Sequence, residues 1–430
     1  RNESYEYLGK SITMNGGDPN QIDEITATYI EQVEKICQSK LPLSFKVCAL
    51  NNMALAKVLH FFCNTRFQER LLTEIDTFLT NKVRDLFSLY QSTTRDVIYL
   101  SRLHGGIGVK EFSTVYYCTR IAFIVKMLNH REENFRYIAR QSLKLDMRKR
   151  NVSVSNESNN FLGFEVNENG YLVSKNSFGC KTEWMELNRY CRKLNVKLQW
   201  INNKATLIFN SNVICNTANI SKSLYEHALV QLKMHAGTLC LQGTFLQIQN
   251  VTEKISNTIH YNWKLNDQLL IFCVKARLNI LPTNFTLFIW NRENNPRCPF
   301  CNHVTESMAH LLNGCYTEFG NFYSRRHDRV VDYLYDQIKS VDRRYRTYNN
   351  KNIETILPVN RDILLLCNCR RPDIIRFDPI NRNIEIIEIT ICYDLYFEQA
   401  RISKNEKYIP LVNALESLGY SVKMYVLCFG

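Results

Sequence analysis

The chain has 430 residues, and its 54 Lys and Arg against 41 Asp and Glu give a formal net charge of +13. This length leaves room for roughly two to four domains, each with its own core. The positive balance favours a polyanionic partner such as nucleic acid or an anionic membrane surface, although charge also serves simple solubility. The apolar runs, such as Ile121–Val125, are much shorter than the roughly 20 residues that cross a bilayer, so we expect no membrane-spanning role.

The 16 cysteines are spread along the whole chain, unlike the dense pattern of a small secreted disulfide scaffold. The first residues lack the pattern of a secretory signal peptide, so we expect reduced cysteines and an intracellular protein. The chain begins at Arg1, inside what looks like a structural element, and we therefore expect a fragment of a longer protein.

From residue 5 to about 129, apolar residues recur at three- and four-residue spacing, which predicts packed helices. The glycines of "SRLHGGIGVKEF" predict a tight turn between two of them. Residues 145 to 160 pass from a basic run into a Ser/Asn tract and are predicted to be a linker. Alternating patterns in the next hundred residues predict short strands, and we assign no chemistry to them.

A helical pattern returns near residue 261 and stops at Pro282. Its basic residues Lys275 and Arg277 are candidate nucleic-acid contacts, although a solvated helix face explains them equally well. The run after the last cysteine of "CPFCNHVTESMAHLLNGC" is helical, basic and rich in tyrosine. From about residue 355 onward, strand and helix patterns alternate, which predicts an α/β domain.

The stretch "CPFCNHVTESMAHLLNGC" contains a C-x2-C-x8-H-x4-C pattern. Three thiolates and one imidazole form the ligand set of a closed tetrahedral zinc site, which has no position left for a substrate. The sequence therefore predicts a structural zinc, and the alternative is a group of reduced residues in an ordinary core. His303 is a further candidate, but it follows Cys301 too closely to be as suitable as His310. The predicted ligands are Cys298, Cys301, His310 and Cys315.

Two acids near the C-terminus fall in predicted strands. Strand alternation places Glu388 on the same face as Ile384 and Ile386, so a carboxylate is embedded in an apolar strand. A buried carboxylate costs several kcal/mol unless it is paired or metal-bound. Together with Asp373 on the neighbouring strand, Glu388 can hold Mg²⁺ through oxygen ligands, and such a metal activates water toward a phosphodiester.

The helix predicted after these strands carries two lysines one turn apart, Lys404 and Lys407. A lysine beside the metal can orient the water or stabilise a pentavalent phosphate. Solvated lysines are common on helices, and the sequence does not decide which of the two is catalytic. The order of acid strand, acid strand and lysine helix favours a nuclease core.

The succession "CPFCNHVTESMAHLLNGC", "RRHDRVV", "RRPDIIRFD", "IEIIEITICYD" and "KNEKY" resembles the C-terminal half of non-LTR retrotransposon polyproteins with a restriction-like endonuclease. In addition, "YEYLGKSI" is similar to the segment after the polymerase palm, "HGGIGVKEF" to the Gly-rich motif beyond the thumb, and "KARLNILPTNFT" to the motif ahead of the zinc knuckle. These proteins nick chromosomal DNA and prime reverse transcription of their own RNA from the freed 3′ hydroxyl.

The resemblance implies roles for particular residues. Asp373 and Glu388 would bind the catalytic magnesium, Lys404 or Lys407 would be the catalytic lysine, and Arg371 would be a neighbour of the site. Nucleic-acid contacts are expected from the basic residues Arg325, Arg326, His327, Lys275 and Arg277. Thr390 stands where restriction-type nucleases usually have their lysine, so the lysine must come from the helix. The paired polymerase aspartates are absent from this chain, so we expect no polymerase activity from it.

The expected fold is a multidomain α+β protein in four parts. These are the end of a reverse transcriptase domain with a helical thumb (1–145), a mixed linker region (161–280), a small zinc knuckle with flanking basic helices (281–345) and an α/β restriction-like nuclease of the PD-(D/E)xK type (355–430). We expect a nuclear, magnesium-dependent DNA endonuclease with structural zinc, acting on double-stranded target DNA and binding element RNA. The alternatives are a nucleic-acid-binding remnant that no longer cuts, and a zinc-stabilised adaptor, which leaves the charge and the acid pair unexplained.

Overall fold

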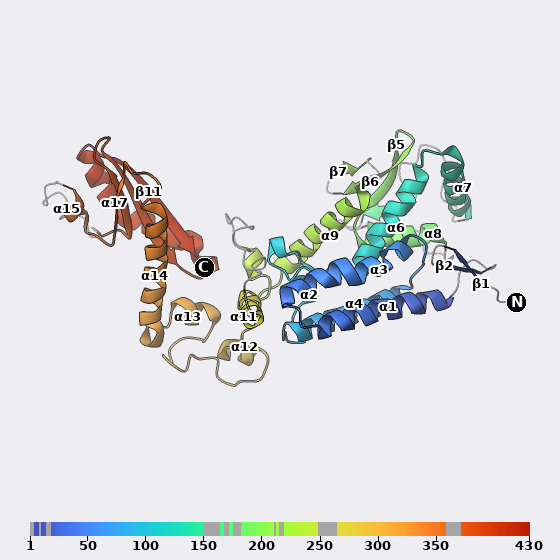
Figure 1. The fold of residues 1–430 in the computed structure, drawn as a ribbon, viewed down its shortest axis with the longest axis horizontal. Helices are drawn as coiled ribbons and strands as arrows, with labels where there is room; N and C mark the ends of the chain where they lie inside the picture. The colour runs from blue at the N-terminus through green and yellow to red at the C-terminus, as the bar shows by residue number, and fades with distance from the viewer. Residues whose placement is uncertain are drawn as a thin grey trace. The chain divides into compact units, whose positions relative to one another are not determined.

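The protein is described by a computed structural model (Figure 1), which combines many helices with small sheets and is therefore α+β. The described residues are 4–7, 10–13, 19–149, 164–166, 172–174, 182–209, 212–214, 219–247, 265–357 and 371–430. The chain divides into two compact units, one comprising residues 1–239 and 251–273, the other residues 240–250 and 274–430.

Helices dominate the first unit. Its elements are β1 (Ser4–Tyr7), β2 (Lys10–Thr13), α1 (Pro19–Gln38), α2 (Leu43–Ala49), η1 (Leu50–Ala54), α3 (Leu55–Leu59), η2 (His60–Cys63), α4 (Glu69–Leu86), α5 (Arg95–Tyr99), η3 (Arg102–His104), α6 (Phe112–Leu128), α7 (Glu133–Lys149), β3 (Phe164–Val166), β4 (Leu172–Ser174), α8 (Glu183–Lys193), β5 (Lys197–Ile201), β6 (Lys204–Phe209), β7 (Asn212–Ile214) and α9 (Ile220–Gly237). Two antiparallel pairs, β1–β2 and β3–β4, and an antiparallel sheet β5-β6-β7 accompany the helices.

The core of the first unit is built around α6. Phe112 and Tyr116 are fully buried there and pack edge-on against Phe62 and Phe67, with ring centroids 4.9–5.8 Å apart. The apolar spacing that predicted helices up to residue 129 thus corresponds to buried helix faces.

The predicted glycine turn lies between η3 and α6. Gly105 ends η3 in the left-handed region, at φ 84°, which a residue without a Cβ adopts at no cost. At Gly106, an added Cβ would lie 2.1 Å from the carbonyl oxygen of Leu100. The turn therefore depends on glycine at both positions, for the positive φ of Gly105 and for the close approach of Leu100 to Gly106.

Two expectations for this unit need correction. The helical region was expected to begin at residue 5, but β1 and β2 form an antiparallel hairpin before α1 begins. The linker was expected over 145–160, but α7 continues through Lys149, because Leu143 and Met147 bury one face of the helix, at 2% and 4% exposure. The remainder of that linker lies outside the described residues.

The second unit contains a four-stranded mixed sheet. Its elements are η4 (Thr244–Leu246), the end of α11 (Asp267–Arg277), α12 (Asn284–Ile289), α13 (Met308–Asn313), α14 (Tyr316–Ile338), β8 (Arg346–Asn349), α15 (Ile353–Ile356), β9 (Ile374–Asp378), β10 (Asn383–Ile391), η6 (Asp394–Tyr396), α17 (Phe397–Ser417) and β11 (Ser421–Phe429). The strand order is β11-β10-β9-β8. β8, β9 and β10 pair antiparallel, and α17 crosses over to bring β11 parallel to β10. The sheet therefore starts at β8, ahead of the boundary expected at residue 355.

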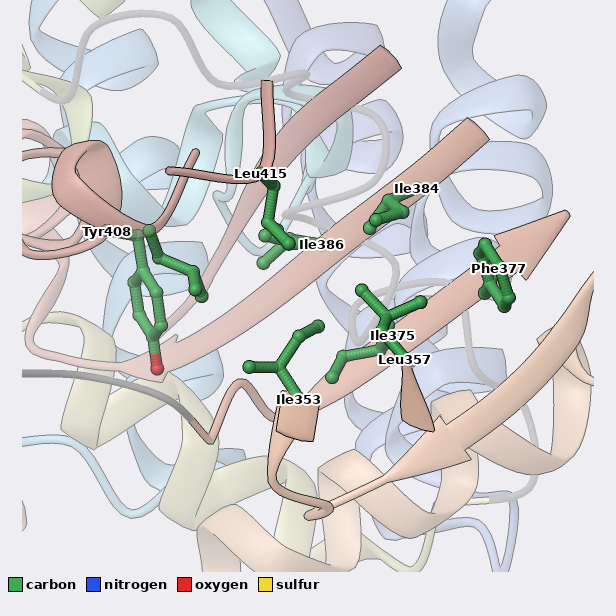
Figure 2. Close-up of a cluster of buried hydrophobic side chains, with 9 residues drawn as sticks. Ile353, Leu357, Ile375, Phe377, Ile384, Ile386, Tyr408 and Leu415 are labelled. Atoms are coloured by element: carbon green, nitrogen blue, oxygen red, sulfur yellow. The ribbon is translucent and has the colours of Figure 1, made fainter. Parts of the chain in front are cut away.

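The alternation predicted for β10 is present. Figure 2 shows Ile384 and Ile386 in a buried cluster with Tyr408 and Leu415 of α17. Ile389, of the opposite parity, packs instead in a cluster with the α14 side chains. Because one face of β10 meets α17 and the other meets α14, the strand is apolar on both faces, and Glu388 lies in the face that meets α17.

Candidate metal centre and candidate active site

The predicted zinc ligands come from three neighbouring elements. Cys298 and Cys301 lie in the loop before α13, His310 lies within α13, and Cys315 immediately precedes α14 as its N-cap. Their four ligand atoms all lie within 4.8 Å of one another. His303, the further candidate, does not belong to this group.

The separations within the cluster are those of a tetrahedral site. With zinc–sulfur bonds of about 2.3 Å and zinc–nitrogen bonds of about 2.0 Å, two sulfurs should be about 3.8 Å apart, and a sulfur and a nitrogen about 3.5 Å. Cys298 Sγ lies 3.8 Å from Cys315 Sγ, and Cys301 Sγ lies 3.5 Å from His310 Nε2. The sulfur–sulfur distance is also far too long for a disulfide, which needs about 2.05 Å. The cluster can therefore hold a metal ion such as zinc.

Local hydrogen bonds explain why this loop gathers its ligands. The N–H of Cys298 donates to the Val304 carbonyl at 2.8 Å, which closes the loop around Cys301. The backbone N–H groups of His303 and Val304 lower the pKa of the Cys301 thiol, which favours the thiolate that a metal binds. The Ser307 hydroxyl caps α13 by accepting from the N–H of His310 at 3.2 Å.

The two predicted acids meet at the end of the β9–β10 ladder. The ladder pairs Ile374 with Ile387, so Asp373 and Glu388 are the next cross-strand neighbours, on one face of the sheet. Both are buried, at 8% and 2% exposure. The N–H of Asp373 donates to Glu388 Oε2 at 3.3 Å, and the N–H of Ile389 donates to Asp373 Oδ2 at 2.8 Å.

Of the two candidate lysines, the structure brings Lys404 to the acids. Its Nζ lies 2.6 Å from Glu388 Oε1, and its side chain is 27% exposed. Lys407 is exposed, and its ammonium lies 5.0 Å from the centre of the Tyr408 ring. The buried charge of Glu388 is thus compensated by Lys404.

His327 joins this cluster from α14, although the sequence indicated a nucleic-acid contact for it. Its Nε2 lies 3.3 Å from Asp373 Oδ2 and 3.3 Å from the Ile389 carbonyl oxygen. The hydrogen bond with Asp373 raises the pKa of His327 to about 9, although burial opposes the shift. Burial alone would raise the pKa of Asp373, but His327 and the N–H of Ile389 together lower it.

A signal for this placement was present in the sequence. His327, Val331, Leu334 and Ile338 follow one another at helical spacing, and the last three pack on the sheet. The apolar stripe of α14 therefore continues onto His327, which predicts that the imidazole faces the sheet and not the solvent.

The other predicted residues lie around these two sites. Arg371 is exposed, donates from Nε to the Asn350 carbonyl at 2.8 Å, and accepts at its own carbonyl from the Tyr408 hydroxyl at 3.3 Å. It is thus next to Asp373 in the chain but does not contact the two acids through its guanidinium in the described structure.

The predicted nucleic-acid contacts differ in their availability. Arg325 is exposed on α14. Arg326 donates to the Leu312 carbonyl and to Asn313 Oδ1, at 3.0 and 2.7 Å. Arg277 lies over the Phe245 ring at 5.2 Å, and Lys275, on the same helix, is half-buried. Of these four residues, only Arg325 is therefore both exposed and located on α14, the helix that follows the zinc cluster.

The comparisons with known proteins assign the chain to no family. No helix in the described part of the chain is long and apolar enough to span a membrane. No protein-family model matches the chain, and no curated protein matches it. The geometry of its two sites is therefore what supports a function.

Proposed function

We propose that the second unit is a magnesium-dependent DNA endonuclease within a fragment of a non-LTR retrotransposon polyprotein. The observation that carries the proposal is the cluster of Asp373, Glu388 and Lys404. The two buried acids are cross-strand neighbours at the end of the β9–β10 ladder, and Lys404 of the crossover helix α17 contacts Glu388. A protein that needed only stability would gain more from apolar residues at these positions.

The two acids suit a magnesium ion. Magnesium is usually bound by one or two carboxylates and completes its octahedron with waters and substrate phosphates. Within the described structure, the hydrogen bonds and the ion pair of the Asp373 carboxylate use Oδ2, which leaves Oδ1 as a donor for a cation. When bound between the acids, the ion would polarise a phosphodiester and lower the pKa of an attacking water.

Residues of the chain itself would hold the metal-binding oxygens in place and stabilise the charge on the phosphate. Glu388 and Asp373 are held rigidly by backbone N–H groups and by their partners, so their oxygens need little reorganisation. Lys404 is partly exposed and already lies beside the acids, so its ammonium can stabilise negative charge on a phosphate oxygen or orient a water.

The surroundings fit a nucleic-acid substrate. The net charge of +13 favours a polyanion, and Arg325 extends basic character along the helix that reaches the acid pair. By the resemblance, residues 1–145 would be the end of a reverse transcriptase domain with its thumb, 161–280 a linker region, 281–345 the zinc knuckle and 355–430 the nuclease. The partners would be double-stranded target DNA and element RNA, in the nucleus.

The test is nicking of supercoiled plasmid by the purified zinc-loaded chain in Mg²⁺. Glu388→Gln removes the charge and keeps the shape, and we expect it to abolish nicking while DNA binding persists. Glu385→Gln is the matched control, because Glu385 lies on the same strand, with the opposite parity, and pairs with Arg376 away from the acids. Equal nicking by wild type and Glu388→Gln would sink the proposal. DNA binding without nicking by the wild type would favour the non-cutting remnant.

A further inference from the structure

The helix α14 begins at the zinc cluster. Its N-cap is the ligand Cys315, and its first turns are fastened to the segment that carries the other helical ligand. The Tyr323 hydroxyl donates to the Leu311 carbonyl at 2.7 Å and accepts from the N–H of Cys315 at 3.2 Å. Arg326 adds bonds to Leu312 and Asn313. The start of α14 therefore has a fixed position relative to the cluster.

The middle of the same helix is fixed to the sheet. His327 contacts Asp373, and one turn later Val331 is fully buried against the strands that carry the acids. Asp332 Oδ1 accepts from the Asn349 side chain of β8 at 3.1 Å. Cys315 and His327 are twelve residues apart in the chain, which in a continuous α-helix spans about 18 Å.

We propose that α14 is a rigid link through which the zinc cluster sets the orientation of Asp373, with His327 as the positioning residue. The inference rests on the proposed endonuclease for its purpose, but not for its geometry. A hydrogen bond to one carboxylate oxygen fixes the plane of the carboxylate and so aims the other oxygen. Because Oδ2 is occupied by His327 and Ile389, Oδ1 is the oxygen presented to a cation.

This role differs from a nucleic-acid contact. The His327 side chain is only 28% exposed, and its Nε2 lies between Asp373 and the Ile389 carbonyl. Both acceptors lie at the same end of the β9–β10 ladder. The imidazole can therefore bind them only if α14 has the correct position relative to the sheet. The zinc ligands determine that placement at the other end.

The first test is Mn²⁺ binding to the zinc-loaded full chain, measured by titration calorimetry without DNA. We expect His327→Ala to weaken Mn²⁺ binding about 10- to 100-fold, the usual cost of losing a hydrogen bond that orients a metal ligand. His327→Gln keeps an N–H donor and should recover part of the loss. Tyr333→Ala, an exposed change on the same helix, should leave Mn²⁺ binding unchanged. Unchanged or tighter binding by His327→Ala overturns the proposal, since the imidazole would then be neutral or a competing cation.

The second test follows the link itself by hydrogen–deuterium exchange. Zinc is removed by a chelator or by Cys301→Ser, and peptides covering the start of α14, residues 371–378 and α17 are compared. We expect faster exchange in the first two and little change in α17. A change confined to the knuckle, or an equal loss of protection throughout the sheet, overturns the link, because zinc would then act either locally or on the whole unit.

These tests separate the two proposals. A wild-type chain that binds Mn²⁺ but does not nick DNA contradicts the endonuclease, while the effect of His327→Ala on Mn²⁺ binding still decides the link. If the chain does nick, the Mg²⁺ concentration for half-maximal nicking should rise in His327→Ala, and the rate at saturating Mg²⁺ should fall much less.

Discussion

The ammonium of Lys404 lies 2.6 Å from Glu388 Oε1, across the face between α17 and the sheet. Lys407 lies one turn further along α17 and is exposed beside the Tyr408 ring. The sequence left both lysines as candidates, because both fit the same short motif. Tyr408, Leu411 and Leu415 fix the rotation of the helix by burying its apolar stripe on the sheet, and that rotation distinguishes the two.

The two lysines should therefore respond differently to alanine substitution. We expect Lys404→Ala to slow nicking by on the order of 10²-fold, the scale of losing one positioned donor at a developing charge. Lys407→Ala should remain within a few-fold of wild type, since its ammonium contacts none of the acids. Single-turnover nicking in saturating Mg²⁺ measures both.

Loss of folding is controlled by comparing thermal unfolding of both variants with wild type. Lys404→Arg is informative as well, because it keeps the charge but changes its shape. If Lys407→Ala is the slow variant and Lys404→Ala is not, the lysine assignment made from the structure is wrong.

The metal centre should contain one tightly held zinc per chain. This prediction rests on the sulfur–sulfur and sulfur–nitrogen distances in the cluster, which agree with those expected around a tetrahedral zinc ion. Elemental analysis should return one zinc for wild type and little for Cys298→Ser, because the Cys298 side chain is fully buried in the cluster. Cys240→Ser, an exposed cysteine outside the cluster, is the matched control and should keep its zinc. Equal zinc content in the first variant contradicts the site.

Local patterns were sufficient for the zinc cluster and for much of the acid pair. The four cluster residues lie within 18 positions of one another, so spacing alone predicts their meeting. The alternation of β10 predicts a buried Glu388, and the neighbouring strand supplies Asp373. In both cases the contacts are short-range in sequence or follow from a single antiparallel pairing.

Long-range packing decided the rest. His327 and Asp373 are 46 positions apart in the chain, so only the docking of α14 on the sheet shows their contact. The basic run around it indicated a nucleic-acid surface, whereas the apolar stripe of α14 indicated the sheet. Arg326 is a second case in which the sequence did not show the partner. Its charge suggested a contact with a nucleic-acid phosphate, but its guanidinium donates to Leu312 and Asn313 at the end of α13.

Nucleic-acid binding should depend steeply on salt. Neutralising several phosphates releases counterions, so affinity for duplex DNA should fall by orders of magnitude between about 50 and 200 mM salt. Arg325 is exposed, and if it contacts one phosphate as we propose, Arg325→Ala should reduce the salt slope by about 1. Arg401→Ala removes an arginine that is already paired with Glu398 and serves as the control. An affinity that stays flat over this range indicates a different partner.

The first unit should become less stable as the pH rises from about 4 to 7, because of Asp76. This residue is 2% exposed in α4, and its Oδ1 accepts from the N–H of Ser113 at 3.3 Å. Burial, followed by the nearby Glu111, raises the pKa of Asp76 to about 7. An acid with a raised pKa binds its proton more tightly in the folded state. The contribution of the Asp76 carboxyl to the stability of the folded state is therefore most favourable below its ordinary pKa of 3.8. This contribution is lost as the pH rises through the pKa of the folded state.

Asp76→Asn keeps an oxygen for the N–H of Ser113 but cannot ionise, so it should stabilise the first unit, and by more at pH 8 than at pH 5. Each pH unit crossed between the two pKa values is worth about 1.4 kcal/mol. The measurement is urea-dependent hydrogen exchange of the α4 and α6 peptides in the full chain, at both pH values. Asp85→Asn, an exposed change in the same helix, should show no comparable difference. A gain of equal size at pH 5 and pH 8 means that the Asp76 carboxyl does not titrate in this range, and contradicts the prediction.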